Sequence, residues 1–477
     1  MTAGSRATGW TWAAWAYAAA VAAVLGHFVL GIPVQVSDSF GNLAQVQESS
    51  LGAVAHAAFG GQAGFYRPML WVTLKAVADL AGPHLTAWFR GALVVQVVLL
   101  VVLFVRLVRV RTRVDAAALP LALAVLVGLH TFNGTIREAF PINTFMTILI
   151  ACLAAANLSA SRGGWLTDVA AVVLLAFSAL TVETGLLVWV VLVAALIAGF
   201  RGVSRGGLAA STFIVVAYFV LRFAVLTVGT PSLSERSTGF GFRVLESAEL
   251  QARFGARAWP LYAYTVAGNL SSLLFSEPRG GVFLFVRSLV EGQVPSWRLV
   301  NVVASSLATL LVGVVGTARF RAWRRGATPE WHDRLLVIAL AVTGANAAIG
   351  YAYSKDVIMS PAGVFYAVAV FVAARAAAGW LGEPGRRLTL AAGVVFFAVL
   401  SAAWAVRAAG LHESLRREAY VVREDWATVD QDLPQLGIRL TPAGEVLKTV
   451  LQDQALAADP PPRLAWPLSY DLFDQDF

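Results

Sequence analysis

The chain has 477 residues, of which 58% are hydrophobic and 13% are charged, and its formal net charge is +8. Soluble domains carry about 25% charged residues, so this composition excludes a soluble multidomain protein and a disordered chain. Apolar stretches of about 18 residues recur along the chain, which predicts a polytopic membrane protein. The stretches are continuous and do not alternate with period two, so helices are predicted and an outer-membrane barrel is not.

The sequence predicts about eleven membrane-spanning helices, with boundaries good to a few residues. In chain order they cover residues 11–32, 88–106, 115–131, 142–158, 167–183, 185–200, 208–228, 297–317, 335–352, 361–378 and 388–408. The segment 258–276 is also apolar, but a span there would put the arginines of 319–325 on the wrong side of the membrane. A re-entrant or interfacial helix is therefore predicted for 258–276.

Short arginine clusters between the spans predict the orientation, because short loops rich in Arg face the cytoplasm. They lie at 106–113, 201–205, 319–325 and 386–387. The N-terminus is then cytoplasmic and the C-terminus extracytoplasmic. Since the arginines are spread over these clusters, no nucleic-acid partner is predicted. Abundant Ala, Val, Leu and Arg with few Lys is typical of a GC-rich bacterial genome, so the bacterial inner (plasma) membrane is the expected location.

Two long loops and a tail remain outside the membrane in this topology. The loops cover 33–87 and 229–296, and the polar tail follows a transmembrane domain of residues 1–408. From Leu411 onward the chain holds 12 acidic and 6 basic residues. Residues 409–477 are therefore predicted to form an acidic extracytoplasmic segment, and a large outer face suggests chemistry at the outer leaflet.

Ionisable residues at the predicted outer boundary are the strongest candidates for that chemistry, because a charge near the membrane is costly unless it is used or paired. The chain has no phosphate-binding glycine motif, no zinc-ligand spacing and a single cysteine, Cys152, which cannot form an intramolecular disulfide. The candidates share one side of the membrane in the predicted topology. They are Asp38, Arg67, Glu138, Glu183, Arg222, Lys355 and Asp356.

Several segments that carry these residues resemble one family. Phe65-Tyr66-Arg67-Pro68-Met69 is similar to the Tyr-Arg-Pro-Leu motif of membrane glycosyltransferases of the C superfamily, notably the O-mannosyltransferases with tetratricopeptide tails. Further similar segments follow in the family's order, and the resemblance covers about residues 10–375. These segments are 136–139, 180–186, 218–222 and, more loosely, 354–361.

The resemblance implies an all-α bundle of the C-superfamily type that moves a mannose-like hexose from a polyprenyl-phosphate donor to an extracytoplasmic acceptor, with inversion. The acceptor is a protein, a lipid or a glycan. Such a transfer needs a carboxylate to take the proton from the acceptor hydroxyl. Asp38, just beyond the first span, is the predicted catalytic base.

The transfer also needs cations that stabilise the departing lipid phosphate. The predicted phosphate ligands are Arg67, Arg222, Lys355 and Arg279, with Arg287 a weaker candidate. No cofactor is required by this reading. A divalent metal is left open, because arginines alone can neutralise a monophosphate leaving group.

Four more residues are predicted to contact the acceptor or to hold the structure. They are Tyr66, Glu138, Glu183 and Asp356. Glu183 in particular has two readings, since it could orient the acceptor or pair with Arg222 to close the bundle. A structural pair would be costly to break, because removing one partner leaves an uncompensated charge.

The chain departs from the family in three places. Asp38 stands alone where these enzymes often carry paired acids, Val182 replaces the usual lysine before the glutamate, and the acidic tail replaces the tetratricopeptide repeats. Two other classes therefore stay open. A lipid-linked sugar flippase or polysaccharide polymerase would keep its function when Asp38 becomes Asn. A non-catalytic assembly factor would use the tail as its working part.

Overall fold

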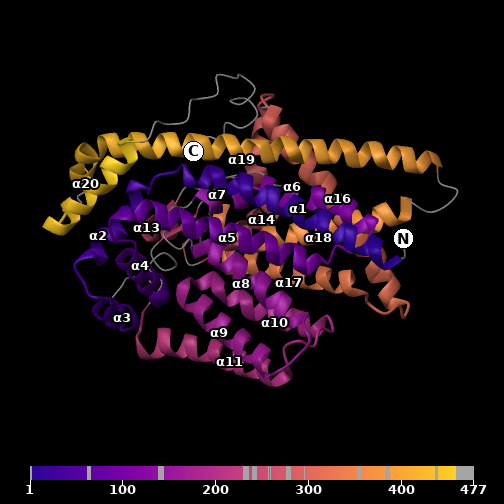
Figure 1. The fold of residues 1–477 in the computed structure, drawn as a ribbon, viewed down its shortest axis with the longest axis horizontal. Helices are drawn as coiled ribbons and strands as arrows, with labels where there is room; N and C mark the ends of the chain where they lie inside the picture. The colour runs from indigo at the N-terminus through magenta and orange to yellow at the C-terminus, as the bar shows by residue number, and fades with distance from the viewer. Residues whose placement is uncertain are drawn as a thin grey trace.

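The fold is an all-helical bundle with one small hairpin in the described part of the chain (Figure 1). The hairpin pairs β1 (Arg236–Thr238) with β2 (Val244–Glu246) in antiparallel fashion. The computed structural model describes residues 3–61, 66–137, 144–228, 236–238, 244–255, 257, 259–275, 281–294, 296–351, 356–381, 387–435 and 439–457.

The helices of the first half include two single π-helical turns, η1 and η4. In order they are α1 (Ala3–Leu30), η1 (Val36–Phe40), α2 (Gly41–Gln47), α3 (Leu51–Phe59), α4 (Pro68–Ala81), η2 (Gly82–His84), α5 (Leu85–Val108), α6 (Arg113–Gly128), α7 (His130–Arg137), α8 (Thr144–Ser159), α9 (Trp165–Thr181), η3 (Glu183–Leu186), α10 (Leu187–Ile197), α11 (Arg205–Phe219) and η4 (Val220–Val225).

The second half contains the longest helix, α19, and the short helix that follows it. In order the elements are α13 (Ser247–Phe254), α14 (Trp259–Phe275), α15 (Gly281–Val290), α16 (Ser296–Arg324), α17 (Trp331–Ile349), η6 (Asp356–Met359), α18 (Ser360–Leu381), α19 (Arg387–Gln435) and α20 (Pro442–Ala457). The segment predicted to be re-entrant or interfacial forms helix α14, which packs against α16 and α17.

The long apolar helices make the chain a helical polytopic membrane protein. Among the described residues, seven helical segments are long and apolar enough to cross a membrane, or eight if the bent pair α6–α7 counts as one span. Three shorter apolar helices cover Phe145–Ser159, Trp165–Thr181 and Glu183–Ile197. Each of the eleven predicted spans overlaps one of these helices, while the number of eleven crossings stays a prediction.

Helix α18 lies at the centre of the bundle and is buried on nearly all sides, between α6, α16 and α17. Its sequence is apolar around the whole helix, as expected for a helix without a solvent or lipid face. Helices α11 and α16 instead expose large apolar side chains such as Phe213 and Leu310. Apolar side chains that no other part of the protein covers, on helices long enough to span a membrane, are consistent with contact with lipid.

The tail lies against the first long loop at one end of the molecule, the end opposite the N-terminus (Figure 1). Helix α19 has 49 residues, and at a rise of about 1.5 Å per residue it is about 73 Å long. The predicted boundary at residue 409 therefore falls inside one continuous helix. Helix α20 packs against α2, and Gln454 Nε2 donates to the carbonyl oxygen of Pro83 at 2.6 Å.

Candidate functional site

A break between α9 and α10 presents Glu183. Helix α9 ends at Thr181, and Val182 adopts an extended conformation before η3 begins at Glu183. Gly185 follows, and a Cβ atom there would collide with the carbonyl oxygen of Ser178. The close approach of η3 to the end of α9 therefore requires glycine, and it fixes where the Glu183 carboxylate lies.

Arg67 reaches the same carboxylate from the first loop. It immediately precedes α4, whose first residue is Pro68, a residue that suits the first helical position because it has no N–H to satisfy there. The Arg67 guanidinium donates from Nε at 3.0 Å and from Nη2 at 2.7 Å, both to Oε2 of Glu183. The Arg67 side chain is 29% exposed, so this end of the pair reaches the surface.

Arg222 completes the cluster from the π-helical turn η4. Its Nη2 donates to Oε1 of Glu183 at 3.2 Å, and its Nη1 donates to the hydroxyl of Tyr218 at 2.6 Å. The Arg222 side chain is only 2% exposed. We call these residues the Arg67–Glu183–Arg222 triad. The triad contains the Glu183–Arg222 pair, which is one of the two interpretations of Glu183 that the sequence offers. Two guanidinium groups and one carboxylate give the three side chains a net charge of one positive unit.

Tyr66 and Tyr218 form an aromatic wall beside the triad. Their ring centroids lie 6.1 Å apart, and together with Ala179 they make a small buried apolar cluster. Burial raises the pKa of the Tyr66 phenol, so this hydroxyl stays neutral at physiological pH. The Tyr66 hydroxyl has no hydrogen-bond partner among the described residues, which leaves a buried polar atom next to the charged cluster.

The described structure gives no side-chain position for five of the other predicted site residues. Glu138, Lys355 and Arg279 lie outside the described residues. Asp38 and Asp356 lie in η1 and η6, but their side chains are outside the described part.

The weaker candidate Arg287 lies on the exposed face of α15. Its Nε donates to Oε1 of Glu291 one turn later, at 2.8 Å. An exposed pair of this kind contributes little to stability, because solvent screens both charges.

A second polar cluster, which the sequence did not reveal, holds the chain just before η1. Glu418 of the tail accepts from Gln35 Nε2 at 2.7 Å and lies 3.7 Å from Arg137 Nη1. The buried Arg90 donates to the carbonyl oxygens of Ile32 and Pro33. We call Gln35, Arg90, Arg137 and Glu418 the loop–tail cluster. Arg90 was visible as a charge inside an apolar run, whereas nothing distinguished Glu418 from the other tail acids.

The tail also contacts the chain just before η1 and at the last residue of η1 through Trp426. The indole Nε1 donates to the carbonyl oxygen of Val34 at 2.6 Å, and the ring packs edge-on against Phe40 with centroids 5.4 Å apart. The short turn that carries Asp38 is therefore clamped by the C-terminal segment at both ends. A loop that is already fixed at both ends loses little further conformational entropy when one of its side chains is held in place.

Two further observations concern ligands. Among the described residues, no group of three or more His, Cys, Asp or Glu side chains is arranged to hold a metal ion. An apolar recess of about 580 Å³ lies between α1, α6 and α19. None of the residues predicted to bind the sugar donor lines this recess.

The fold and the cluster define a helical polytopic membrane protein with a net positive, partly exposed triad built from three distant segments. No protein-family model, no curated protein and no solved structure matches the chain. The motif resemblance and the geometry of the triad are therefore the basis for a functional proposal.

Proposed function

We propose that the chain is an integral membrane glycosyltransferase of the C-superfamily type, acting at the outer face of the bacterial plasma membrane. It moves a mannose-like hexose from a polyprenyl-phosphate donor to an extracytoplasmic acceptor with inversion. One observation carries the proposal. The Tyr-Arg-Pro, Thr-Val-Glu-Thr-Gly and Tyr-x-x-x-Arg segments resemble family motifs, and their charged residues meet in the triad although they are 116 and 39 residues apart along the chain.

The net charge of the triad suits the leaving group of this reaction. When the glycosidic bond breaks, negative charge develops on the lipid phosphate, and fixed cations stabilise that charge in a site with little water. Arg67 is the partly exposed member, so it is the residue proposed to contact the phosphate. Glu183 holds Arg67 in position, and the buried Arg222 in turn holds Glu183.

Asp38 is proposed to be the base. The acceptor oxygen attacks the anomeric carbon as the bond from that carbon to the phosphate oxygen breaks. The acceptor proton passes to the Asp38 carboxylate, and polyprenyl phosphate leaves with the bonding electrons. Asp38 and Arg222 both lie in π-helical turns, which are rare and occur frequently at functional sites.

The proposal is tested by following polyprenyl phosphate release. The purified full chain in lipid nanodiscs is mixed with a polyprenyl-phospho-mannose and with acceptor candidates of the three classes. We expect release by the wild type and a loss of about 10²–10⁴-fold in Asp38→Asn. Asp79→Asn is the matched control, because Asp79 is an exposed acid of the same predicted loop whose partner is Lys75, outside the triad.

Two outcomes would count against the proposal. Wild-type release by Asp38→Asn would remove Asp38 as the base. Absence of release from the wild type with every donor and acceptor pair would argue against a transferase.

A non-catalytic assembly factor is a second candidate, favoured by the pairing within the triad. Both predicted phosphate ligands with described side chains, Arg67 and Arg222, already bond to Glu183. In that case the triad only stabilises the packing of the helices, and the tail that packs on the first loop would bind the partner protein. Release of polyprenyl phosphate by the wild type separates the two candidates, because an assembly factor releases none.

A further inference from the structure

The apolar recess between α1, α6 and α19 opens to the outside of the bundle. Alanine, valine and leucine side chains make up most of its walls. Leu25 and Leu123 line it and are buried, whereas Tyr17 and Val24 line it and are exposed. Helices α1 and α19 are long and apolar enough to cross a membrane, and α6 belongs to the bent pair that does so together. In a bilayer the recess therefore faces lipid hydrocarbon.

The recess ends near the outer boundary of the predicted membrane region. Helices α1 and α19 run in the same direction, from the N-terminal end of the bundle toward the first loop (Figure 1). At the end of the recess, Phe28 packs edge-on against His412 with ring centroids 4.8 Å apart. The first predicted span ends four residues after Phe28, at residue 32. This end of the recess therefore lies about 6 Å below the predicted boundary, at about 1.5 Å per helical residue.

The loop–tail cluster lies just beyond that end. Glu418, which bonds to Gln35, follows His412 by six residues, or about 9 Å along α19. The hydrocarbon core of a bilayer is about 30 Å thick and the whole bilayer about 40–45 Å, which leaves about 5–8 Å for the headgroups on each side. A lipid whose chain occupies the recess thus has its headgroup at the level of the loop–tail cluster.

The face of α19 that lines the recess continues to η1, the turn that carries Asp38. Residues seven apart in a helix lie on nearly the same face. Helix α19 has this spacing in Ala405, His412, Ala419 and Trp426. The first two line the recess, and Trp426 packs against Phe40 at the end of η1. One helix face therefore joins the recess to the turn with the predicted base.

Two buried polar atoms near this turn have no hydrogen-bond partner within the described ranges. One is the hydroxyl oxygen of Ser39, the neighbour of Asp38 in η1, and the other is Nη1 of Arg90 in the loop–tail cluster. Both side chains are only 1% exposed. A buried donor without an acceptor is costly, because it has lost its bonds to water. Oxygen atoms of a lipid headgroup in the loop–tail cluster would supply acceptors.

The triad lies on the other side of the bundle from the recess. Helices α9 and α11, whose ends adjoin Glu183 and Arg222, form the side opposite α1 and α19 (Figure 1). A donor whose phosphate is bound by Arg67 therefore enters the membrane on the α9–α11 side. Its polyprenyl chain then does not occupy the recess, which leaves the recess to a second lipid.

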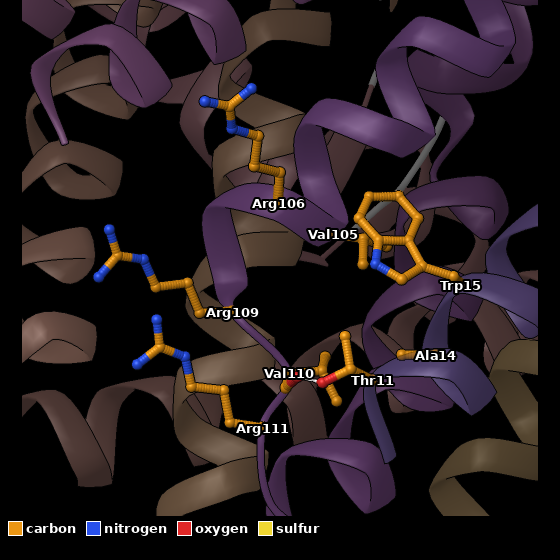
Figure 2. Close-up of a pocket in the computed structure, with 8 residues that line it drawn as sticks. All are labelled: Thr11, Ala14, Trp15, Val105, Arg106, Arg109, Val110 and Arg111. Carbon is orange, nitrogen blue, oxygen red and sulfur yellow. Dashed lines mark hydrogen bonds between the residues drawn. The ribbon is translucent and has the colours of Figure 1, made fainter. Parts of the chain in front are cut away.

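A smaller recess of about 180 Å³, between the N-terminal part of α1 and the end of α5, lacks these features (Figure 2). Figure 2 shows the side chains of Arg106, Arg109 and Arg111 extending away from α1. The Arg109 guanidinium lies 3.1 Å from the centroid of the Trp331 ring and donates to the carbonyl oxygen of Ala160 at 3.3 Å. These arginines therefore do not converge on one headgroup.

We infer that the acceptor is a membrane lipid, with a hydrocarbon chain in the large recess and a hydroxyl-bearing headgroup at the loop–tail cluster. The assignment rests on the proposed function, because an acceptor presupposes sugar transfer. The headgroup oxygen bonds to the anomeric carbon as the bond from that carbon to the phosphate oxygen breaks. The hydroxyl proton passes to Asp38, and polyprenyl phosphate leaves with the bonding electrons. Donor and acceptor thus reach the reaction from opposite sides of the bundle.

The fate of labelled mannose tests the class of acceptor. The full chain, in nanodiscs made from a total bacterial lipid extract, receives radiolabelled polyprenyl-phospho-mannose. We expect release of polyprenyl phosphate and a new labelled lipid without any added acceptor. Release only after addition of a serine- and threonine-rich peptide or a soluble oligosaccharide would overturn the lipid acceptor and keep the transferase. Absence of release under every condition would contradict the transferase itself.

A photoreactive lipid tests the recess independently of activity. The probe is a glucosyl diacylglycerol with a diazirine in one acyl chain, and we expect crosslinks to residues 17–25 and 405–412. The double variant Ala20→Phe with Ala409→Phe fills the recess from two exposed lining positions. It should lower both crosslinking and transfer to lipid at least about tenfold. If the double variant does not assemble, Ala409→Phe alone gives the same test.

The matched control is Ala19→Phe with Ala392→Phe, which enlarges exposed alanines of the same two helices outside the recess. The control should keep both crosslinking and transfer. Equal crosslinking in the filled variant and the control would show that the lipid chain does not occupy the recess. Excess unlabelled polyprenyl-phospho-mannose should not displace the probe, and displacement would assign the recess to the donor chain and overturn the inference.

Discussion

Arg67 donates two hydrogen bonds to the same carboxylate oxygen of Glu183, from Nε and from Nη2. This contact joins the start of α4, in the first loop, to the break between α9 and α10. Arg222 binds the other oxygen of that carboxylate, so Glu183 is the centre of the triad. The geometry predicts that the three residues are not equivalent when they are changed singly.

Glu183→Gln should destabilise the protein more than Arg222→Met. Loss of the carboxylate leaves two guanidinium groups without it, one of them 2% exposed, whereas loss of Arg222 leaves Glu183 paired with Arg67. Breaking a buried pair costs about 3–5 kcal/mol, and the partial exposure of Glu183 places the expected loss near the lower limit. The double variant Glu183→Gln with Arg222→Met should recover much of the stability lost in Glu183→Gln, because the buried guanidinium is then absent as well. Melting temperatures in detergent give the comparison.

The control for this series is Glu291→Gln, which removes the exposed partner of Arg287 and should leave the melting temperature unchanged. Equal destabilisation by Glu183→Gln and Arg222→Met, without recovery in the double variant, would contradict a triad centred on Glu183.

Arg67→Lys should weaken donor binding more than it lowers stability. Lysine keeps the charge but loses the planar fork, and Arg67 is partly exposed. We expect a loss of about 1–3 kcal/mol in the affinity for the donor, a polyprenyl-phospho-mannose, measured by titration in nanodiscs without acceptor. Arg222→Lys should show the opposite balance, because the buried Arg222 binds Tyr218 and Glu183. Unchanged donor affinity in Arg67→Lys would leave Arg67 with a structural role only.

Gly185→Ala should disrupt the triad through the backbone. The added Cβ collides with the carbonyl oxygen of Ser178, so η3 must move away from α9 and carry Glu183 with it. Overpacking of this kind costs about 1–3 kcal/mol or more. Gly313→Ala, in the middle of α16 with open space around it, is the control and should be neutral or stabilising. Thermal unfolding of both variants provides the measurement, and a neutral Gly185→Ala would contradict the close packing.

Trp426→Phe should loosen the first loop without unfolding the bundle. Phenylalanine places a smaller aromatic ring beside Phe40 and removes the indole N–H that donates to the carbonyl oxygen of Val34. Hydrogen exchange of the amides in 32–40 should become faster, and donor turnover should fall. Glu418→Gln should act in the same direction through Gln35 and Arg137. The exposed Glu424→Gln, on the same helix, should change neither exchange nor turnover, and protection as strong as in the wild type would rule out the clamp.

The predicted orientation can be tested with single cysteines, since the native Cys152 is buried and should not react. Val446→Cys, on the exposed face of α20, should be labelled in intact cells by a maleimide that cannot cross membranes. Arg325→Cys, at the end of α16, should be labelled only after permeabilisation. The reverse pattern would move the triad to the cytoplasmic side and remove the basis for an extracytoplasmic transfer.

The sequence by itself determined the helical membrane class and where the apolar helices lie, because the length and continuity of an apolar run are local properties. It also located the break between the predicted spans 167–183 and 185–200, whereas the helix that begins at Pro68 lies in a segment that was predicted to be a loop. The change in composition at Leu411 suggested a boundary, yet α19 continues through it. Its buried residues, such as Leu415 and Trp426, keep packing onto the bundle beyond that point.

Only the tertiary structure decided which charged residues meet. Glu183 binds Arg67 and Arg222 from other segments, and Gln35 binds Glu418 at a separation of 383 residues. Helices that are apolar all round carry little information about which face meets which neighbour, since almost any face could be buried. Those pairings depend on the summed packing of many helices, and they set the charge and the exposure of the candidate site.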